Sequence, residues 1–156
     1  MSVQIIVDSS VDVAERFRER LHIVPLIIHF GEEELIDGVT INKEQFYRRL
    51  VESEQLPFTS QASPVAFQKV YEEVIQAGDS AVVITLASKL SGTYQSACIA
   101  AGDFDNIYVV DSQTAAIASG ILAESALRCA QEGLSGREIA AALEQKRQEV
   151  RLIAML

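Results

Sequence analysis

Short apolar runs alternate along this chain with segments that have the periodicity of amphipathic helices, and this alternation constrains the fold more than any other feature. The run Val3 to Val7 is apolar with little alternation, which is typical of a strand buried on both faces. A helix is expected next, from about Asp12 to Leu21, with apolar residues at every fourth position on one face. Strands separated by helices imply right-handed parallel crossovers. The sequence therefore predicts an α/β fold, a mostly parallel sheet with helices on both faces.

The other expected elements continue this alternation. Further strands are predicted at Ile23 to Phe30, Ala81 to Leu86, Asn106 to Val110 and Val150 to Leu156, and further helices at Lys43 to Ser53, Ser63 to Gly78, Thr114 to Gln131 and Ser135 to Glu149, with one more after the Ser88 loop. Pro25 cannot donate to a strand ladder, so its strand should lie at a sheet edge or begin just after it. Gly31 and the acidic residues 32–34 indicate a turn.

Composition narrows the class of protein. The chain has 156 residues with 49% hydrophobic and 22% charged residues, which predicts one globular domain. A net charge of -9 argues against binding to nucleic acid.

Cys98 and Cys129 fall in apolar helical patterns and are expected to be free and buried. His22 and His29 lack the spacing of a metal site, so no metal is expected. The start of the chain has no signal-peptide pattern and no apolar run reaches membrane length, so we expect a cytoplasmic protein without an integral membrane segment.

Two segments rich in hydroxyl groups are the strongest candidates for a binding site. One, Ser88 to Ala97, follows a predicted strand and leads into a predicted helix, and the other is Thr59 to Pro64. Ligands of open α/β sheets collect at the carboxyl ends of the strands, where helix N-termini attract anions. If both segments lie at this edge, their hydroxyls can converge on one small anionic group, such as a carboxylate or a phosphate.

Simpler roles compete with this interpretation. Serine and threonine between a strand and a helix are often N-caps, although the segment Ser88 to Ala97 carries more hydroxyls than one cap requires. Asp8 and Asp111 each end a buried strand beside a serine, which is compatible with capping and also with phosphoryl or acyl transfer that uses the Ser88 loop. Ser88 and Lys89 lack a nucleophile elbow. A binding protein, a transferase and a domain that only binds a partner protein therefore remain as alternatives.

Several motifs, taken in order, resemble one known family. They are Ile6 to Ser10, Val24 to Leu26 with His29 to Gly31, Asp37 to Val39, Thr59 to Pro64, Ser88 to Ala97 and Val110 to Ser112. The whole chain resembles the N-terminal domain of the DegV family of bacterial fatty-acid-binding proteins. This resemblance implies a carrier, not an enzyme, which needs no cofactor and holds a long-chain fatty acid such as palmitate. It also implies a fatty acid kinase as partner, which receives the carboxylate and makes acyl phosphate for phospholipid synthesis.

The resemblance also assigns site residues and a missing part. Thr59 and Ser91 correspond to the family's carboxylate-binding residues, with Ser60, Gly92 and Thr93 as neighbours. The family has a second lipid-binding α/β domain, whose arginine and histidine approach the carboxylate, and we expect residues 1–156 to be the first domain with the second absent from this chain. Ala62 stands where the family commonly has proline. Apolar residues proposed for the acyl tail, which also suit an ordinary core, are Phe67, Val70, Ile99, Ala115, Ile117, Ala118 and Ile121.

Overall fold

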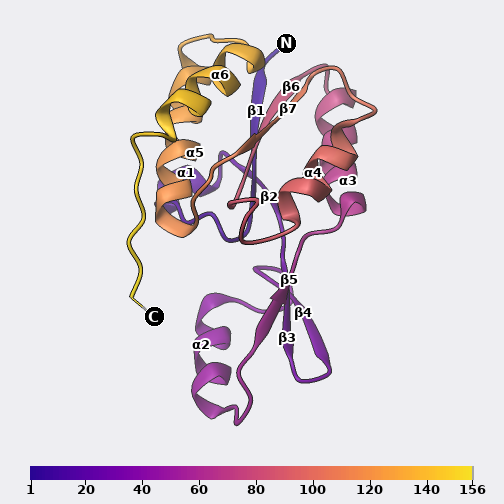
Figure 1. The fold of residues 1–156 in the computed structure, drawn as a ribbon. Coiled ribbons are helices and arrows are strands. Elements are labelled where there is room, and N and C mark those ends of the chain that lie inside the picture. Colours follow the sequence, from indigo (N-terminus) through magenta and orange to yellow (C-terminus); the bar gives the residue numbers. More distant parts are fainter. Residues whose placement is uncertain (156) are drawn as a thin grey trace.

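The computed structural model describes residues 1–155 and consists of a large lobe and a small lobe (Figure 1). The large lobe contains a four-stranded sheet in the order β2-β1-β6-β7, in which every neighbouring pair is parallel. Its strands are β1 (Val3–Asp8), β2 (His22–Val24), β6 (Ser80–Thr85) and β7 (Ile107–Asp111). Its helices are α1 (Glu15–Arg18), α3 (Pro64–Gln76), α4 (Thr93–Ala101), α5 (Ala116–Gln131) and α6 (Gly136–Lys146). The predicted α/β fold with a parallel sheet is confirmed.

Helices cover both faces of this sheet because its strands are apolar on both sides. Ile5 and Val7 of β1 pack into a cluster with Leu122 of α5. Ile6, between them, faces the other way and packs in a cluster with Phe67 of α3 and Ala97 of α4. All six residues of β6 are buried, as expected for a central parallel strand.

The small lobe is a separate antiparallel sheet that the sequence did not predict. Its strands are β3 (Ile27–Phe30), β4 (Glu33–Ile36) and β5 (Phe58–Ser60), in the order β4-β3-β5, and it also contains α2 (Lys43–Glu52). Figure 1 shows this lobe next to the carboxyl ends of the parallel strands. The small lobe therefore lies on the side where the hydroxyl segments were expected to meet.

Several predicted boundaries of strands and helices were wrong. A proline and the pairing of strands in a second sheet explain most of these differences. The predicted strand Ile23 to Phe30 is two strands in two different sheets, because the chain leaves the large sheet at Pro25. The predicted acidic turn is shorter than expected: Gly31, with φ of +62°, makes the turn, while β4 begins at Glu33. Only four residues of the first predicted helix are helical.

The ends of the later elements follow local signals more closely. Asn42 and Ser135 form the capping boxes of α2 and α6, and Ser63 caps α3. The predicted last strand is wrong for residues 150–155, which form neither helix nor strand, and residue 156 lies outside the described part. Cys98 and Cys129 are free thiols, as predicted, but both are only half-buried.

Candidate functional site

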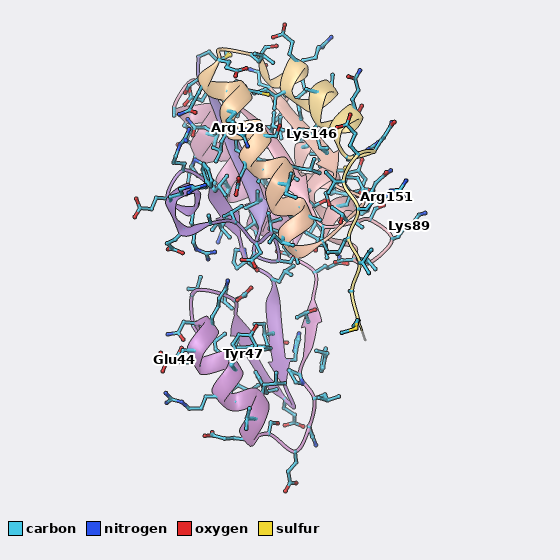
Figure 2. The ribbon with its side chains drawn as sticks, turned by 90° about the vertical axis from the view of Figure 1, so that its left-hand side faces the viewer. Glu44, Tyr47, Lys89, Arg128, Lys146 and Arg151 are labelled. Carbon is cyan, nitrogen blue, oxygen red and sulfur yellow. The ribbon has the colours of Figure 1, made fainter. Side chains whose placement is uncertain are left out.

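Thr59 lies on the wall of a cavity at the junction of the two lobes. It belongs to β5, where a loop was expected, and pairs with Ile28 of β3. The cavity has a volume of about 310 Å³, within the range of about 300 to 1,000 Å³ found for small-molecule sites. Its lining combines apolar side chains with a few polar groups: Leu26, Ile28, Phe46, Tyr47 and Leu86 with Ser10, Asp37, Lys43 and Thr59. Tyr47 projects from α2 of the small lobe (Figure 2). An apolar wall with a few hydroxyl groups beside it suits an amphipathic ligand.

Ser60, one residue later, is directed differently. Its hydroxyl lies 2.6 Å from Nε2 of His29, and Phe58 stacks on the same imidazole with ring centroids 4.4 Å apart. Successive side chains of a strand point to opposite faces of the sheet. Ser60 therefore lies on the face opposite Thr59, and its predicted part in the site remains a prediction.

Ser91, Gly92 and Thr93 form the turn that opens α4. The Ser91 hydroxyl accepts from the Thr93 backbone N–H at 3.2 Å and lies 2.9 Å from the Thr93 hydroxyl. One hydroxyl of this pair donates to the other, so the acceptor keeps its own proton for a third group. Thr93 is fully buried and Ser91 is half-buried. Of the two, Ser91 is the better placed to meet a ligand.

The two hydroxyl segments are in contact through Gln61, which follows β5 directly. The Gln61 amide donates from Nε2 to the Ser96 hydroxyl of α4 at 3.2 Å. It also lies against Gly92, where an added Cβ would stand 1.9 Å from Oε1 of Gln61. The segments meet, as expected, but the joint role of Thr59 and Ser91 in binding stays a prediction.

Asp8, the last residue of β1, is hydrogen-bonded to two residues that line the cavity beside Thr59. It is fully buried and accepts from the Ser10 N–H at 2.9 Å, the Ser10 hydroxyl at 2.5 Å and the Leu86 N–H at 2.7 Å. Burial raises the pKa of this carboxyl, and the hydrogen bonds from Ser10 and Leu86 oppose that shift. Because Ser10 and Leu86 both line the cavity, Asp8 holds two parts of its wall in place.

Asp111 has a similar structural role at the end of β7. It accepts from the backbone N–H and the hydroxyl of Ser88, at 3.1 and 2.6 Å, and from the Gln113 N–H at 2.9 Å. Thus Ser88 is paired with Asp111 and is not directed at Ser91. The chain's own donors occupy both Asp8 and Asp111, which favours a structural role over phosphoryl or acyl transfer. The expected capping of the next helix is wrong for both, because the N-caps of α1 and α5 are Ala14 and Ala115, without a side-chain hydrogen bond.

Sequence reasoning missed several residues of this edge. Gln61 lies within the segment Thr59 to Pro64, but no role was predicted for it, and Ser10 was not predicted to line a site. Gln113, in the loop before α5, and Ala116, the first residue of α5, have φ of 57° and 51°, which is strained for residues other than glycine. The position of Gln61 between hydroxyl residues was an available signal, whereas the backbone strain has none in the sequence.

The residues proposed for the acyl tail differ in burial. Val70 and Ala115 are half-buried, and Val70 packs against the cluster that contains Phe67. Phe67 and Ala118 are buried in the core, so the core interpretation holds for them. Ile117 and Ile121 are exposed by 63% and 47% and lie four residues apart on α5, and Ile99 of α4 is also exposed. These exposed isoleucines are available to a ligand or a partner.

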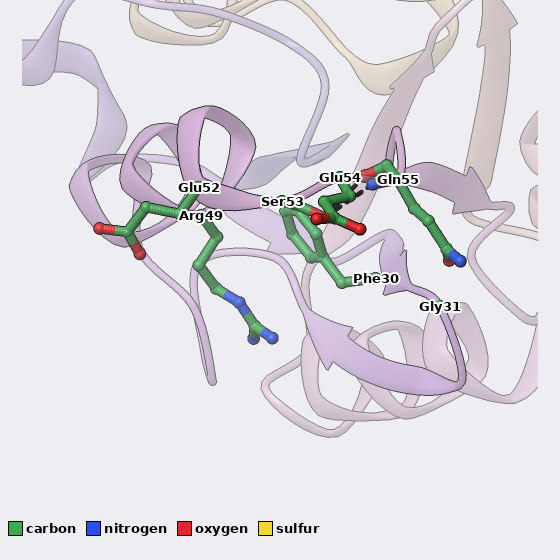
Figure 3. A pocket seen from close by; sticks show the side chains of 7 residues that line it. All are labelled: Phe30, Gly31, Arg49, Glu52, Ser53, Glu54 and Gln55. Atoms are coloured by element: carbon green, nitrogen blue, oxygen red, sulfur yellow. Dashed lines mark hydrogen bonds between the residues drawn. The ribbon is translucent and has the colours of Figure 1, made fainter.

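A larger cavity of about 430 Å³ lies at the end of α2 (Figure 3). Its lining is mostly polar: Phe30, Gly31, Arg49, Glu52, Ser53, Glu54 and Gln55. Arg49 lies over the Phe30 ring and pairs with Glu33, so both its charge and the aromatic face are engaged. This cavity lacks the apolar wall of the one beside Thr59 and is a weaker candidate for a lipid.

Two further features bear on the class of site. Among the described residues, no group of three or more His, Cys, Asp or Glu side chains is arranged to hold a metal ion. Within residues 1–155, no helix has the length and the apolar character needed to cross a membrane.

The family model of DegV, described as an uncharacterised protein family, matches residues 2–156. This chain belongs to the DegV family. A DegV domain-containing protein of Caldanaerobacter subterraneus subsp. tengcongensis is 41% identical over 141 residues, which cover 88% of this chain and 50% of the relative. The DegV protein of Bacillus subtilis is 31% identical over 100% of this chain and 57% of the relative. The chain thus spans about half the length of these DegV relatives.

Solved DegV structures have the same fold. A DegV lipid-binding protein of Thermotoga maritima matches with a TM-score of 0.86 at 32% identity, over 96% of this chain and 55% of that one. DegV of Bacillus subtilis, described as a fatty-acid-binding protein, matches with a TM-score of 0.86 at 30% identity, over 95% and 54%. A fatty-acid-binding DegV protein of Thermus thermophilus matches with a TM-score of 0.83 at 32% identity, over 95% and 54%.

Proposed function

We propose that this chain binds a long-chain fatty acid and presents its carboxylate to a fatty acid kinase, which makes acyl phosphate for phospholipid synthesis. The observation that carries the proposal is the cavity beside Thr59, which is largely apolar and adjoins the segment that touches the Ser91 turn. DegV relatives of the same fold are described as fatty-acid-binding proteins. In this proposal the kinase phosphorylates the fatty acid in the cytoplasm, because it takes the phosphate from ATP.

The proposed division of labour between tail and head group follows from their energetics. Each methylene that leaves water contributes about 0.8 kcal/mol, so the tail supplies most of the affinity. Hydrogen bonds from Thr59 and Ser91 to the carboxylate contribute about 1.5 to 3 kcal/mol each when water is excluded. Two hydroxyls do not neutralise a charge, so the carboxylate has to stay near the surface, where a kinase can reach it.

In this proposal residues 1–156 are the first domain of a two-domain binding protein. The chain spans 54% of the Bacillus subtilis structure, so the remaining part of such a protein has room to supply a second wall for the tail. The exposed Ile117 and Ile121 on α5 are suited to meet either that wall or the tail. The protein itself acts as a carrier and uses no cofactor.

The test combines lipid extraction with a head-group variant. Mass spectrometry of lipids extracted from the purified chain is expected to find a C14 to C18 fatty acid near one equivalent. The double variant Thr59→Ala with Ser91→Ala should bind palmitate about 100-fold more weakly or worse, since two charge-assisted hydrogen bonds of about 1.5 kcal/mol or more each are lost. It should also reduce acyl phosphate formation by a fatty acid kinase with ATP.

Ser88→Ala is the matched control, because Ser88 belongs to the same loop but pairs with Asp111. It should leave palmitate affinity unchanged. Unchanged affinity and unchanged acyl phosphate formation in the double variant would remove the proposed head-group role. Turnover of phosphate esters or acyl esters by the isolated chain, lost in Ser88→Ala, would favour the transferase instead.

A further inference from the structure

Gln61 joins the two lobes at the point where the hydroxyl segments meet. Its backbone continues β5, the edge strand that carries Thr59, whereas its side-chain amide reaches α4 of the large lobe. The Ser96 hydroxyl that accepts from Gln61 is only 2% exposed. A hydrogen bond to a buried acceptor on a rigid helix has a defined direction and length. The amide therefore holds the end of β5 against α4, together with Ala62, the next residue, which is buried in the same core cluster as Ala97 of α4.

Gly92 fits this amide closely. A Cβ at this position would stand 1.9 Å from Oε1, 2.8 Å from Cδ and 3.2 Å from Nε2 of Gln61. The Gly92 backbone has φ of -72° and ψ of 1°, which other residues also adopt. The glycine thus leaves room for the Gln61 amide, which would have to move if a Cβ were added, and its own backbone conformation does not call for glycine.

We propose that Gln61 is a positioning residue, which sets the separation of the Thr59 and Ser91 hydroxyls so that both bind one carboxylate. This inference rests on the proposed function and deepens it. Thr59 lies two residues before Gln61, and Ser91 lies directly before Gly92. The contact between Gln61 and Gly92 is therefore adjacent to both proposed donors without using either of them.

The small lobe makes such a link necessary. Its buried cluster consists of Ile28, Phe30 and Ile41, and β5 contributes no buried residue to it. An edge strand with so little buried surface moves easily relative to a large core. Hydrogen bonds to a charged oxygen depend steeply on geometry, so movement of Thr59 weakens head-group binding before it weakens tail binding.

The experiment compares palmitate with hexadecanol, which has the same tail and no carboxylate. Dissociation constants for both are measured with the unsubstituted chain and with Gln61→Ala. Palmitate affinity should fall about 10-fold in the variant, equivalent to one charge-assisted hydrogen bond, whereas hexadecanol affinity should change less than about twofold. Gln68→Ala, an exposed glutamine on α3, is the matched control and should change neither value.

Gly92→Ala provides an independent variant of the same contact. Alone, it should displace the amide and reproduce the loss of palmitate affinity. In the Gln61→Ala background it should cost less than about twofold more, because the side chain it would displace is gone and the two effects are not additive. Gln61→Glu should also weaken palmitate more than hexadecanol, since it adds a negative charge beside the carboxylate.

The outcomes separate this inference from the proposed function. If the unsubstituted chain binds no palmitate, the proposed function fails. If it binds palmitate but Gln61→Ala weakens palmitate and hexadecanol equally, or weakens neither, the positioning role is overturned while the proposed function stands. If Gln61→Ala and Gly92→Ala reduce palmitate affinity additively when combined, the positioning role is also overturned.

Discussion

The two lobes differ in how they are held together. The large lobe has a buried apolar cluster on each face of its sheet, and β6 is buried along its whole length. The small lobe has one buried cluster, made of Ile28, Phe30 and Ile41, and none of the 10 residues of α2 is buried. Arg49 and Glu33 form a surface ion pair within the small lobe, and Lys43 of this lobe pairs with Asp12 of the large one. Exposed ion pairs contribute little to stability.

Because of this difference in packing, the two halves of the candidate site lie in lobes of different local stability. Thr59 belongs to the weakly packed lobe, whereas Ser91 belongs to the strongly packed one. Segments with little buried apolar surface open at lower free energy than the core of a protein. We therefore expect ligand binding to order the small lobe more than the large one.

The largest effect on stability is expected from substitutions of buried phenylalanines, which should differ between the two lobes. Phe67→Ala removes a fully buried side chain of the large lobe and should lower the free energy of global unfolding by about 3 to 5 kcal/mol. Phe30→Ala, in the small lobe, should instead raise hydrogen exchange at amides of β3, β4 and β5 with a smaller effect on global unfolding. Denaturant titration and hydrogen exchange measure the two responses. Equal losses of global stability would mean that the lobes unfold as one unit.

Asp8 gives an intermediate effect, because it joins the large lobe to the cavity wall. Asp8→Asn should lower the free energy of unfolding by about 1 to 3 kcal/mol, since an amide nitrogen cannot accept from the Leu86 N–H and leaves that donor unpaired. Urea titration of both proteins at neutral pH measures the loss. No change would show that the cavity wall does not depend on this carboxylate.

The same pair of proteins should differ in pH dependence. Burial raises the pKa of Asp8 above its ordinary value of 3.8, so the folded state takes up this proton at a higher pH than the unfolded state. The stability that the folded protein gains from protonated Asp8 is complete below pH 3.8 and is lost as the pH rises through the pKa of the folded state. The advantage of the unsubstituted chain over Asp8→Asn should therefore grow as the pH falls toward 3.8. An advantage that shrinks over this interval would contradict the raised pKa.

The smallest expected effect compares matching helix caps in the two lobes. Asn42 and Ser135 each form a capping box, one for α2 and one for α6. Ser135→Ala should lower global stability by about 1 kcal/mol, because α6 packs on the large core. Asn42→Ala should mainly speed hydrogen exchange within α2. A similar loss of global stability from both caps would argue against independent opening of the small lobe.

Much of the large lobe was predictable because its signals are local. Continuous apolar runs identified β1, β6 and β7, and the caps at Ser63 and Ser135 identified the starts of α3 and α6. In the small lobe, the cap at Asn42 likewise identified the start of α2. The small sheet was not predictable in the same way. Its strands have three or four residues, and β5 pairs with β3 across a long stretch of chain. The expected final strand failed because an apolar run also needs a partner strand.

For the site, residue types were predictable and their directions were not. The sequence alone determined two hydroxyl-bearing segments, the buried parallel strands and the caps that start three helices, because periodicity and capping depend on near neighbours. The tertiary structure alone decided that Thr59 and Ser60 face opposite sides of a small sheet and that Gln61 lies against Gly92. These contacts join residues about 30 positions apart, and no local pattern specifies which distant side chains will meet.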